Sequence, residues 1–413
     1  MPGGKLASMR ILVIGSGARE HAIVKALIRT GTPATDIVCA PGNEGIAKEV
    51  ETRAVDINDR LAVTKIALEE RAELVVIGPE APLVNGVADA LREQGIAVFG
   101  PNQKAAQLEG SKAFAKEVMA VADVPTGMAR QCTTIEEVES ALDQLGAPYV
   151  VKADGLAAGK GVIVTEDKEA ALAHAKNFIA GGILVEEYLA GQEVSLFFLS
   201  DGETVVPLSP AQDYKRAFDN DEGPNTGGMG AYSPVPWLPE GFIEEVTEKV
   251  ALPTIRELAR RNAKFVGLLY CGLIVTERGT RVIEFNARFG DPETQVVLRR
   301  LTSNLADLLY RAATGKLAVG QSPEFSKKKA VTVVLASEGY PTSTAEVREV
   351  NGIESAESID DVEVCKASPV GRVLSVVGCG DSFQEARTLA YEGMSRIHLE
   401  GGHFRNDIAL KVS

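Results

Sequence analysis

Four short apolar segments alternate with helix-like segments between residues 10 and 100, and this alternation constrains the fold more than any other feature. The apolar segments cover residues 10–14, 37–40, 74–78 and 96–100. Such alternation is typical of a parallel, doubly wound α/β sheet. Ligands of these sheets bind at the carboxyl ends of the strands. In this chain those ends carry Gly15-Ser16-Gly17, Pro41-Gly42-Asn43 and Pro79-Glu80.

The chain has 413 residues, too many for a single hydrophobic core. We predict a doubly wound N-terminal domain over 9–108, a second α/β domain over 109–326 and a small C-terminal α/β cap over 327–413. Within the second domain, residues 124–190 are predicted to form a compact unit of their own. A helix is expected to begin after Ser111, because serine is a good N-cap residue.

Composition and charge exclude several classes of protein. The net charge of −14 disfavours binding to nucleic acid. No apolar run reaches the roughly 18 residues of a membrane span. The five cysteines are scattered and odd in number, which argues against a disulfide framework or a zinc site and favours a reducing cytoplasm. An anionic substrate would have to be held by local cations, helix N-termini and a metal ion.

The segment 282–295, VIEFNARFGDPETQ, carries the clearest candidates for chemistry. Glu284 and Asn286 are two positions apart, so on a strand they point to the same face, with Arg288 next. A carboxylate and an amide oxygen can hold Mg²⁺, and an arginine beside it can clamp a phosphate or carboxylate. This set suits phosphoryl transfer from ATP, although the pair alone is also typical of a solvated strand end.

The glycine-rich segment 151–162, VKADGLAAGKGV, lies between two apolar segments and is predicted to form a hairpin-like loop. It is not a Walker loop, because Gly161 stands where serine or threonine is required. Its glycines would let the backbone close over phosphates, while Lys152 contacts them from the strand. The alternative is a flexible surface turn with solvated lysines.

The segment GSGARE, between a strand and a helix, is suited to binding an anion. It departs from the dinucleotide pattern GxGxxG, because Glu20 occupies the third position and the second strand ends at Ala40-Pro41 without an acidic residue. A sugar phosphate suits the site better than a dinucleotide. Simple tight packing of the turn is the alternative.

The segment 212–232 is long and rich in functional residue types, as in loops that bind substrates. Asp213 could hold an ammonium group, while Asn225, Thr226 and the following glycines could surround a small substrate. A mobile surface loop is the alternative. In the segment 185–195, the chain leaving a strand offers backbone groups to a purine edge and Glu193 to a ribose.

Taken together, these segments resemble the ATP-grasp superfamily and, within it, the phosphoribosylamine–glycine ligase family (glycinamide ribonucleotide synthetases). From Met9 to the C-terminal GGHFRNDIA, the family's strings occur in order, and GPNTGGMGAYSP with EFNARFGDPETQ is the most specific combination. Two positions depart from the family pattern. Ala18 stands where glycine is frequent, which weakens the expectation of a backbone contact there, and Tyr214 stands where histidine is frequent, so no acid–base role is assigned to it.

The resemblance implies a doubly wound pre-ATP-grasp domain, an ATP-grasp domain with a mobile lid at about 124–190, and a C-terminal cap. It also implies ATP-dependent ligation of glycine to 5-phosphoribosylamine through glycyl phosphate, the second step of de novo purine synthesis. ATP would be the co-substrate and Mg²⁺ or Mn²⁺ the metal. The expected protein is cytoplasmic, binds no nucleic acid or membrane, and is a monomer or weak homodimer. A transient contact with the preceding pathway enzyme is a further expectation.

The resemblance also assigns site residues. The metal ligands are Glu284 and Asn286. The predicted nucleotide contacts are Lys112, Lys152, Gly159, Lys160, Gly161, Glu186, Glu187, Tyr188, Leu189 and Glu193. The predicted substrate contacts are Gly15, Gly17, Glu20, Asn43, Glu80, Asp213, Asn225, Thr226, Gly227, Gly228 and Arg288. Among these residues, the predicted catalytic ones are Arg288, Asp213 and Lys152.

Two competing functions remain open from the sequence. The first is another ATP-grasp carboxylate–amine ligase, similar to biotin carboxylase or D-alanine ligase. The second is a non-catalytic protein that binds nucleotide without turning it over. The non-catalytic function is disfavoured, because the chain carries the candidate metal ligands Glu284 and Asn286 together with the candidate phosphate contacts Lys112 and Lys152.

Overall fold

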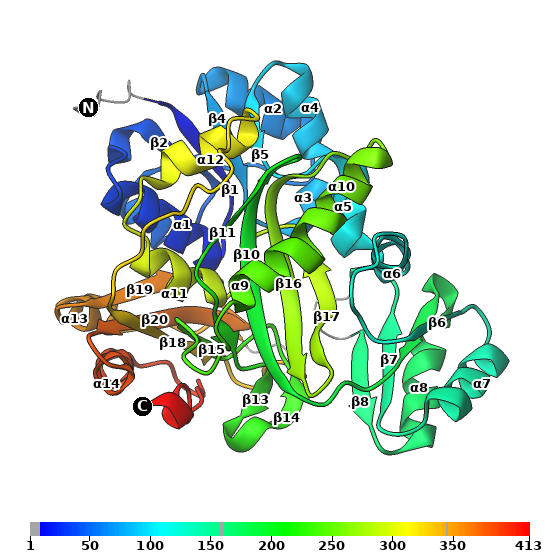
Figure 1. The fold of residues 1–413 in the computed structure, drawn as a ribbon. Helices are drawn as coiled ribbons and strands as arrows, with labels where there is room; N and C mark the ends of the chain where they lie inside the picture. Colours follow the sequence, from blue (N-terminus) through cyan, green and yellow to red (C-terminus); the bar gives the residue numbers. More distant parts are fainter. Residues whose placement is uncertain (1–8, 157–160, 344–345) are drawn as a thin grey trace.

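The computed structural model describes residues 9–156, 161–343 and 346–413 (Figure 1). The predicted nucleotide contacts Gly159 and Lys160 lie outside these ranges. Within the described residues, we find no helix with the length and apolar character needed to cross a bilayer.

The N-terminal sheet is parallel, as the alternating pattern predicted. Its strand order is β3-β2-β1-β4-β5. Its strands are β1 (Ile11–Gly15), β2 (Ile37–Pro41), β3 (Glu51–Thr52), β4 (Leu74–Ile77) and β5 (Ala97–Phe99). Its helices are α1 (Ala18–Arg29), α2 (Arg60–Glu69), α3 (Glu80–Val84) and α4 (Val87–Glu93). Gly86 has a left-handed φ of +80° and separates α3 from α4.

Two helices, α5 (Gln103–Gly110) and α6 (Lys112–Val121), lead from this sheet to a small lid. The hydroxyl of Ser111 accepts a hydrogen bond from the Phe114 N–H, which confirms the predicted cap. The lid has an antiparallel sheet with the strand order β6-β9-β7-β8. Its elements are β6 (Ala129–Cys132), α7 (Ile135–Leu145), β7 (Tyr149–Ala153), β8 (Val162–Thr165), α8 (Lys168–Phe178) and β9 (Ile183–Glu186).

The lid has a small hydrophobic core of its own, built around Val138, Leu142, Val151 and Ile183. In Figure 1 it stands out from the rest of the molecule at the lower right. β7 and β8 form an antiparallel hairpin, as predicted for the glycine-rich segment.

The central antiparallel sheet has the strand order β11-β10-β16-β17. Its strands are β10 (Gln192–Asp201), β11 (Val205–Pro207), β16 (Val266–Thr276) and β17 (Gly279–Asn286). Before β16, a continuous helical segment consists of α9 (Phe242–Val246), a π-helical turn (Thr247–Ala251) and α10 (Leu252–Arg260). After β17 come α11 (Glu293–Arg300) and α12 (Leu305–Ala313).

A five-stranded sheet with the order β12-β15-β18-β20-β19 joins the central part of the chain to its C-terminal part. Its strands are β12 (Gln212–Asp213), β15 (Gly230–Ser233), β18 (Lys329–Ala336), β19 (Val362–Lys366) and β20 (Arg372–Gly380). The helices α13 (Ile353–Glu357) and α14 (Phe383–Ser395) pack beside it. Because β15 pairs with β18, this sheet crosses the predicted boundary at 326/327, and the domain limits stay a prediction.

The segment 212–232, predicted to be a long loop, contains β12, β15 and the hairpin of β13 (Arg216–Phe218) and β14 (Glu222–Asn225). Each of these strands is only two to four residues long. Strands this short show too few residues for an alternating pattern to be recognised.

Candidate active site

β17 places the predicted metal ligands at the end of the central sheet. Glu284 lies opposite Gly272 and Asn286 opposite Tyr270 on β16, so both side chains project from the same face. The Asn286 amide satisfies its neighbours when its nitrogen donates to Glu109 Oε1 and to the Phe285 carbonyl, each at 3.2 Å. This orientation leaves the amide oxygen to serve as a cation ligand.

Two protein oxygen ligands suit Mg²⁺, which can take further ligands from a substrate, better than a metal ion held by protein side chains alone. The part of the chain that the structure describes contains no group of three or more His, Cys, Asp and Glu side chains able to hold a metal ion. Mg²⁺ is commonly bound through one or two protein oxygens together with substrate phosphates. Glu284 and Asn286 match that pattern.

Arg288 lies directly after these ligands and is fixed between two carboxylates. Its Nε donates to Glu80 Oε2 at 3.2 Å, and a terminal nitrogen lies 2.9 Å from Glu109 Oε1. Burial alone would lower the pKa of Arg288, but Glu109, Glu80 and Glu293 outweigh it and raise the pKa. Glu109 also accepts a hydrogen bond from the Ala287 N–H at 2.7 Å. The guanidinium therefore stays charged and links β17 to the N-terminal sheet.

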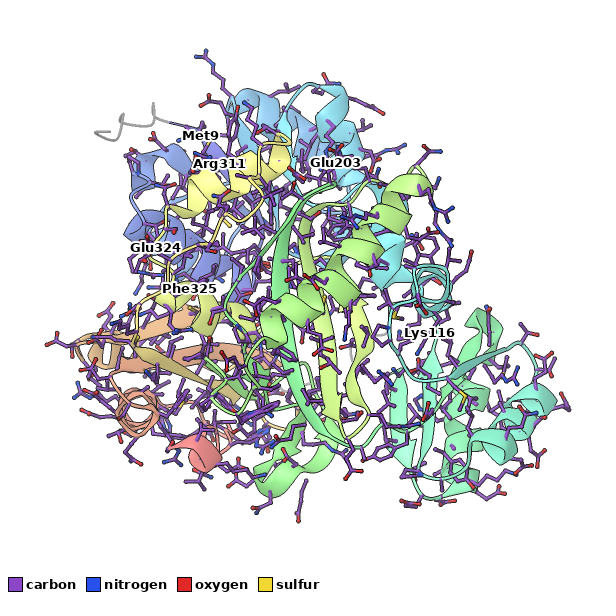
Figure 2. The ribbon with its side chains drawn as sticks, viewed as in Figure 1. Met9, Lys116, Glu203, Arg311, Glu324 and Phe325 are labelled. Atoms are coloured by element: carbon purple, nitrogen blue, oxygen red, sulfur yellow. The ribbon has the colours of Figure 1, made fainter. Side chains whose placement is uncertain are left out.

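Lysines from the body and the lid converge beside these residues. Lys152 on β7 donates to Glu186 Oε2 at 3.0 Å, and Lys116 on α6 lies 3.2 Å from the same oxygen (Figure 2). Burial would raise the pKa of Glu186, but the two lysines hold it below its usual range. Burial lowers the pKa of Lys112, with Glu284 opposing the decrease and Lys152 adding to it. Positive charge is therefore concentrated where the lid meets the body.

Asp154 holds the glycine-rich hairpin against α6. Its Oδ1 accepts hydrogen bonds from the N–H groups of Lys112 at 2.6 Å and Ala113 at 3.4 Å, and its Oδ2 from Ser111 at 3.2 Å. The Lys112 ammonium group donates to the Gly155 carbonyl at 2.9 Å. Asp154 and Gly155, at the end of β7, are therefore tied to the first turn of α6.

Asp213, the predicted ammonium ligand, lies among other carboxylates. Burial raises its pKa to about 7, Lys215 opposes the increase, and Glu293, Glu193 and Glu284 add to it. Lys215 donates to Glu193 Oε2 at 2.8 Å. A substrate ammonium group would relieve the crowding of negative charge around Asp213.

The predicted substrate loop between β14 and β15 is hydrogen-bonded to Lys215, in the connection between β12 and β13. The Thr226 N–H and hydroxyl donate to the Lys215 carbonyl at 2.7 and 2.9 Å. Thr226 Oγ1 in turn accepts a hydrogen bond from the Gly228 N–H at 2.9 Å. The predicted contact Asn225 ends β14 and lies opposite Arg216.

Arg372, on β20, ties this loop to the segment after β17. One terminal nitrogen donates to the carbonyls of Gly227 at 2.8 Å and Asp291 at 2.5 Å. Gly228 has a φ of +115°, and a Cβ there would clash with Pro292. Glycine is therefore required at 228.

The predicted phosphate turn is tightly packed. Glu20 accepts a hydrogen bond from the Gly17 N–H at 2.6 Å, and its carboxylate forms an ion pair with Arg19 at 2.5 Å. A Cβ at Gly15 or Gly78 would collide with the Glu20 side chain. These contacts support the tight-packing alternative for Glu20, while the turn's role in substrate binding stays a prediction.

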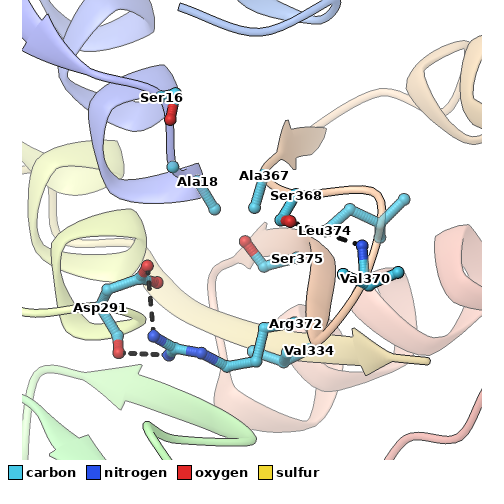
Figure 3. A pocket seen from close by; sticks show the side chains of 11 residues that line it. Ser16, Ala18, Asp291, Val334, Ala367, Ser368, Val370, Arg372, Leu374 and Ser375 are labelled. Atoms are coloured by element: carbon cyan, nitrogen blue, oxygen red, sulfur yellow. Dashed lines mark hydrogen bonds and ion pairs between the residues drawn. The ribbon is translucent and has the colours of Figure 1, made fainter. Parts of the chain in front are cut away.

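A cavity of about 230 Å³ opens beside the N-terminus of α1 (Figure 3). Its wall combines α1, the segment after β17 and the C-terminal strands, through Gly17, Ala18, Asp291, Ser368, Arg372 and Ser375. Asn43 lies nearby and donates to the carbonyls of Ser16 at 2.7 Å and Lys366 at 2.8 Å, which ties the turn to β19. The two sequence-distant regions therefore form one candidate site.

The remaining predicted nucleotide contacts follow β9 at the junction of lid and body. The Glu187 N–H donates to the Met128 carbonyl at 2.9 Å, and its carboxylate pairs with Arg278 at 2.7 Å. Tyr188 is exposed and Leu189 half-buried. On the other side of the hairpin, the Gly161 carbonyl accepts a hydrogen bond from the Ala153 N–H at 2.7 Å.

Sequence reasoning missed Glu109, Lys116, Asp154 and Arg372. Each acts through a partner far away in the sequence, such as Glu109 with Ala287 and Arg372 with Gly227. Local periodicity carries no signal for such pairs. The only local signal is for Lys116, which lies one helical turn after Lys112 and therefore on the same face of α6.

Two features together define the ATP-grasp class of enzymes, which use ATP. One is a lid whose Lys152 shares Glu186 with Lys116 of α6. The other is an antiparallel sheet whose last strand carries Glu284 and Asn286. Residues 110–294 match the phosphoribosylglycinamide synthetase ATP-grasp (A) domain, residues 9–109 its N domain and residues 330–411 its C domain. The chain belongs to the phosphoribosylglycinamide synthetase family.

Similar proteins agree with this assignment over the full length. The chain is 59% identical to the phosphoribosylamine–glycine ligase of Leifsonia xyli, over 98% of this chain and 100% of that protein. It is 54% identical to the enzyme of the same name from Streptomyces coelicolor, over 98% and 100%. The crystal structure of phosphoribosylamine–glycine ligase from Thermotoga maritima has a TM-score of 0.83 at 31% identity, covering 97% of this chain and 100% of that one.

Proposed function

We propose that this protein ligates glycine to phosphoribosylamine with the consumption of ATP, at the site between β17, the lid and the loop after β14. The observation that carries the proposal is the convergence of three groups. Glu284 and Asn286 share one face of β17. Lys112 lies close enough to Glu284 and Lys152 for both to influence its pKa. Asp213 lies close enough to Glu284 for that carboxylate to raise its pKa.

In the first step, a carboxylate oxygen of glycine attacks the γ-phosphorus of ATP, which forms glycyl phosphate and releases ADP. Asp213 would hold the glycine ammonium group, and Arg288 would steady the carboxylate or the transferring phosphoryl group. Arg288 suits this role because its neighbouring carboxylates keep it charged and fixed in place. The negative charge that develops is stabilised by fixed cations in a water-poor site.

In the second step, the amine of phosphoribosylamine attacks the carbonyl carbon of glycyl phosphate. The carbon–oxygen bond to phosphate breaks, inorganic phosphate leaves, and the amine gives up a proton. We place phosphoribosylamine beside the α1 N-terminus, with Gly15, Gly17, Asn43 and Glu80 nearby, because the cavity there opens between α1 and Asp291. Holding both reactants together removes up to roughly 7–11 kcal/mol of the barrier in well-oriented cases.

We place the nucleotide between the lid and the body. Lys112 and Lys152 would contact its phosphates, and the glycine-rich hairpin with Gly161 would cover them. Glu186 to Leu189 would lie along the adenine, and Glu193 would accept the ribose hydroxyls. The exposure of Glu193 supports this placement, since a ligand that enters here can reach its carboxylate.

Mg²⁺, or Mn²⁺ in its place, would be held by Glu284 and Asn286 and would neutralise charge on the transferring phosphoryl group. The available amide oxygen of Asn286 supports this role, as does the two-oxygen donor set.

Phosphate release in the presence of ATP tests the proposal. We expect release that requires both glycine and phosphoribosylamine. Release with bicarbonate or D-alanine, and none with glycine, would favour a ligase of the biotin carboxylase or D-alanine type instead. The biotin carboxylase domain of Hydrogenobacter thermophilus 2-oxoglutarate carboxylase is similar to this chain in fold, with a TM-score of 0.70 at 19% identity. Binding of ATP without any release would favour a non-catalytic protein.

We further propose a cytoplasmic monomer or weak homodimer that takes unstable phosphoribosylamine by transient contact with the enzyme that makes it. The five free, buried cysteines support a reducing environment. Sedimentation at several protein concentrations tests the oligomeric state, and a stable tetramer would contradict it.

A further inference from the structure

The C-terminal tail, residues 403–409, packs against the β13–β14 hairpin of the substrate segment. Arg405 has a fully buried side chain, although it is charged. It donates to both carboxylate oxygens of Asp407, at 2.8 and 2.6 Å. Its other terminal nitrogen donates to Asp221 Oδ1 at 2.9 Å and to the Arg216 carbonyl at 3.1 Å. The tail and the hairpin are therefore joined by one ionic network around the buried Arg405 guanidinium.

The two residues after Arg405 hold the tip of the same hairpin. Asn406 donates from its N–H and its side-chain amide to the two oxygens of Asp219, at 2.7 and 3.0 Å. Asp407 Oδ2 accepts a hydrogen bond from the Asn220 N–H at 2.9 Å. Asn220 has a positive φ of 60°, a conformation that such a contact stabilises.

Tyr214 connects the tail to the candidate glycine site. Its hydroxyl accepts a hydrogen bond from the Ala409 N–H at 2.9 Å, and the Arg405 guanidinium lies 4.9 Å from its ring centroid. In an extended segment, neighbouring side chains point to opposite faces. Because the tail holds Tyr214, Asp213 and Lys215 point to the opposite face, towards the active-site carboxylates, which influence the pKa of both.

We propose that Arg405, with Asn406 and Asp407, positions Asp213 for glycine, so that the C-terminal tail sets the enzyme's affinity for the amino acid. This inference rests on the proposed function, in which Asp213 binds the glycine ammonium group. It also explains the tyrosine at 214, whose ring and hydroxyl are both engaged by the tail.

The expected size of the effect follows from the geometry of the contacts. Lysine cannot reproduce the two-nitrogen contact of arginine with a carboxylate. Without it, the hairpin and the strand that carries Asp213 would lose a fixed position. A displacement of about 1 Å, even far from the chemistry, can cost roughly 10²-fold in activity.

The test compares Arg405→Lys with wild-type protein in the phosphate-release assay. We expect the KM for glycine to rise roughly 10- to 10²-fold, while the KM for ATP changes by less than about two-fold. Arg92→Lys is the control, because the Arg92 guanidinium likewise connects backbone segments, through the carbonyls of Val98 at 3.0 Å and Gly100 at 2.6 Å, but in the N-terminal domain. It should leave the KM for glycine unchanged.

A double-mutant cycle separates positioning from general stabilisation. If Arg405 acts through Asp213, then Arg405→Lys should add little to the effect of Asp213→Asn. Additive effects, or equal increases in KM for glycine and ATP, would overturn the inference.

Should Arg405→Lys fail to fold, Asn406→Ala provides the same test, since Asn406 is exposed and its loss removes only the side-chain contact with Asp219. An unchanged KM for glycine in the folded variants would overturn the positioning role alone. Wild-type protein that shows no glycine-dependent release would instead overturn the proposed function.

Discussion

The lid and the substrate segment flank the same site but are attached to the molecule in different ways. The lid has its own sheet and its own core, and its contacts with the body include Glu186 with Lys116, Asp154 with α6 and Thr126 with Val282 of β17. The substrate segment instead contributes β12 and β15 to a sheet that continues into the C-terminal strands. A movement of the lid would therefore leave its sheet β6-β9-β7-β8 intact, whereas a movement of the substrate segment would break the pairing of β15 with β18.

This difference matches what the two substrates require. The nucleotide must enter and leave, and glycyl phosphate must be protected from water, so a closing lid suits the nucleotide side. Glycine is small and offers few contacts, so its ligands must already be in place. Arg372 and the C-terminal tail hold the substrate segment in place through hydrogen bonds to Gly227 and Asp221.

The largest expected effect tests the point where the two regions meet. Glu284→Ala should lower Mg²⁺-dependent turnover by roughly 10³-fold, because it removes the charged ligand of the metal ion that would neutralise the transferring phosphoryl group. The fold should remain intact by circular dichroism. Glu277→Ala, in the exposed turn of the same β16–β17 hairpin, should retain wild-type turnover. Near-normal activity of the Glu284 variant would show the metal assignment to be wrong.

A second variant tests the lid side alone. Lys152→Met should raise the KM for ATP and lower kcat, together by roughly 10²-fold. It would remove a phosphate contact, and among the described residues it leaves Glu186 with Lys116 as its ion-pair partner. The KM for glycine should change little. Lys176→Met on the exposed face of α8 is the control within the lid. A rise in the KM for glycine equal to that for ATP would argue against separate sites.

A third variant tests the substrate side alone. Asp213→Asn should raise the KM for glycine by roughly 10- to 10²-fold, since a hydrogen bond to a charged group contributes about 1.5–3 kcal/mol. The KM for ATP should stay near the wild-type value. Calorimetric titration with each ligand gives the same comparison at equilibrium. Equal changes for both substrates would reject the ammonium-binding role.

The smallest expected effect is a pH dependence confined to the substrate side. The pKa of Asp213 is raised to about 7, so the carboxyl group is largely protonated below that pH and ionised above it. Only the ionised form attracts an ammonium group, so the KM for glycine should fall as the pH rises through neutrality. The KM for ATP should not follow this profile, and Asp213→Asn should abolish it. A flat profile in wild-type protein would contradict the assignment.

The sequence predicted the features that depend on local patterns. The N-terminal parallel sheet follows from alternating apolar segments, the α6 cap from Ser111, and the shared face of Glu284 and Asn286 from their spacing on a strand. Local patterns did not predict contacts between residues far apart in the sequence. Glu109 with Ala287 and Arg405 with Asp221 join positions 178 and 184 residues apart, which no local period encodes.

The short strands of the substrate segment show the same limit. β12 has only two residues, and it is defined by its pairing with β15 rather than by its own composition. Tyr214 belongs to this case as well, because its role is visible only once the tail lies against it.

Oxygen transfer from labelled glycine tests the central claim most directly. Glycine with ¹⁸O in both carboxylate oxygens is incubated with ATP, Mg²⁺, phosphoribosylamine and the wild-type protein, and the released phosphate is analysed by mass spectrometry. If the carboxylate attacks the γ-phosphorus at the site of Glu284 and Asn286, each phosphate carries one ¹⁸O atom. Phosphate free of label, released together with product, would contradict activation of glycine by phosphorylation.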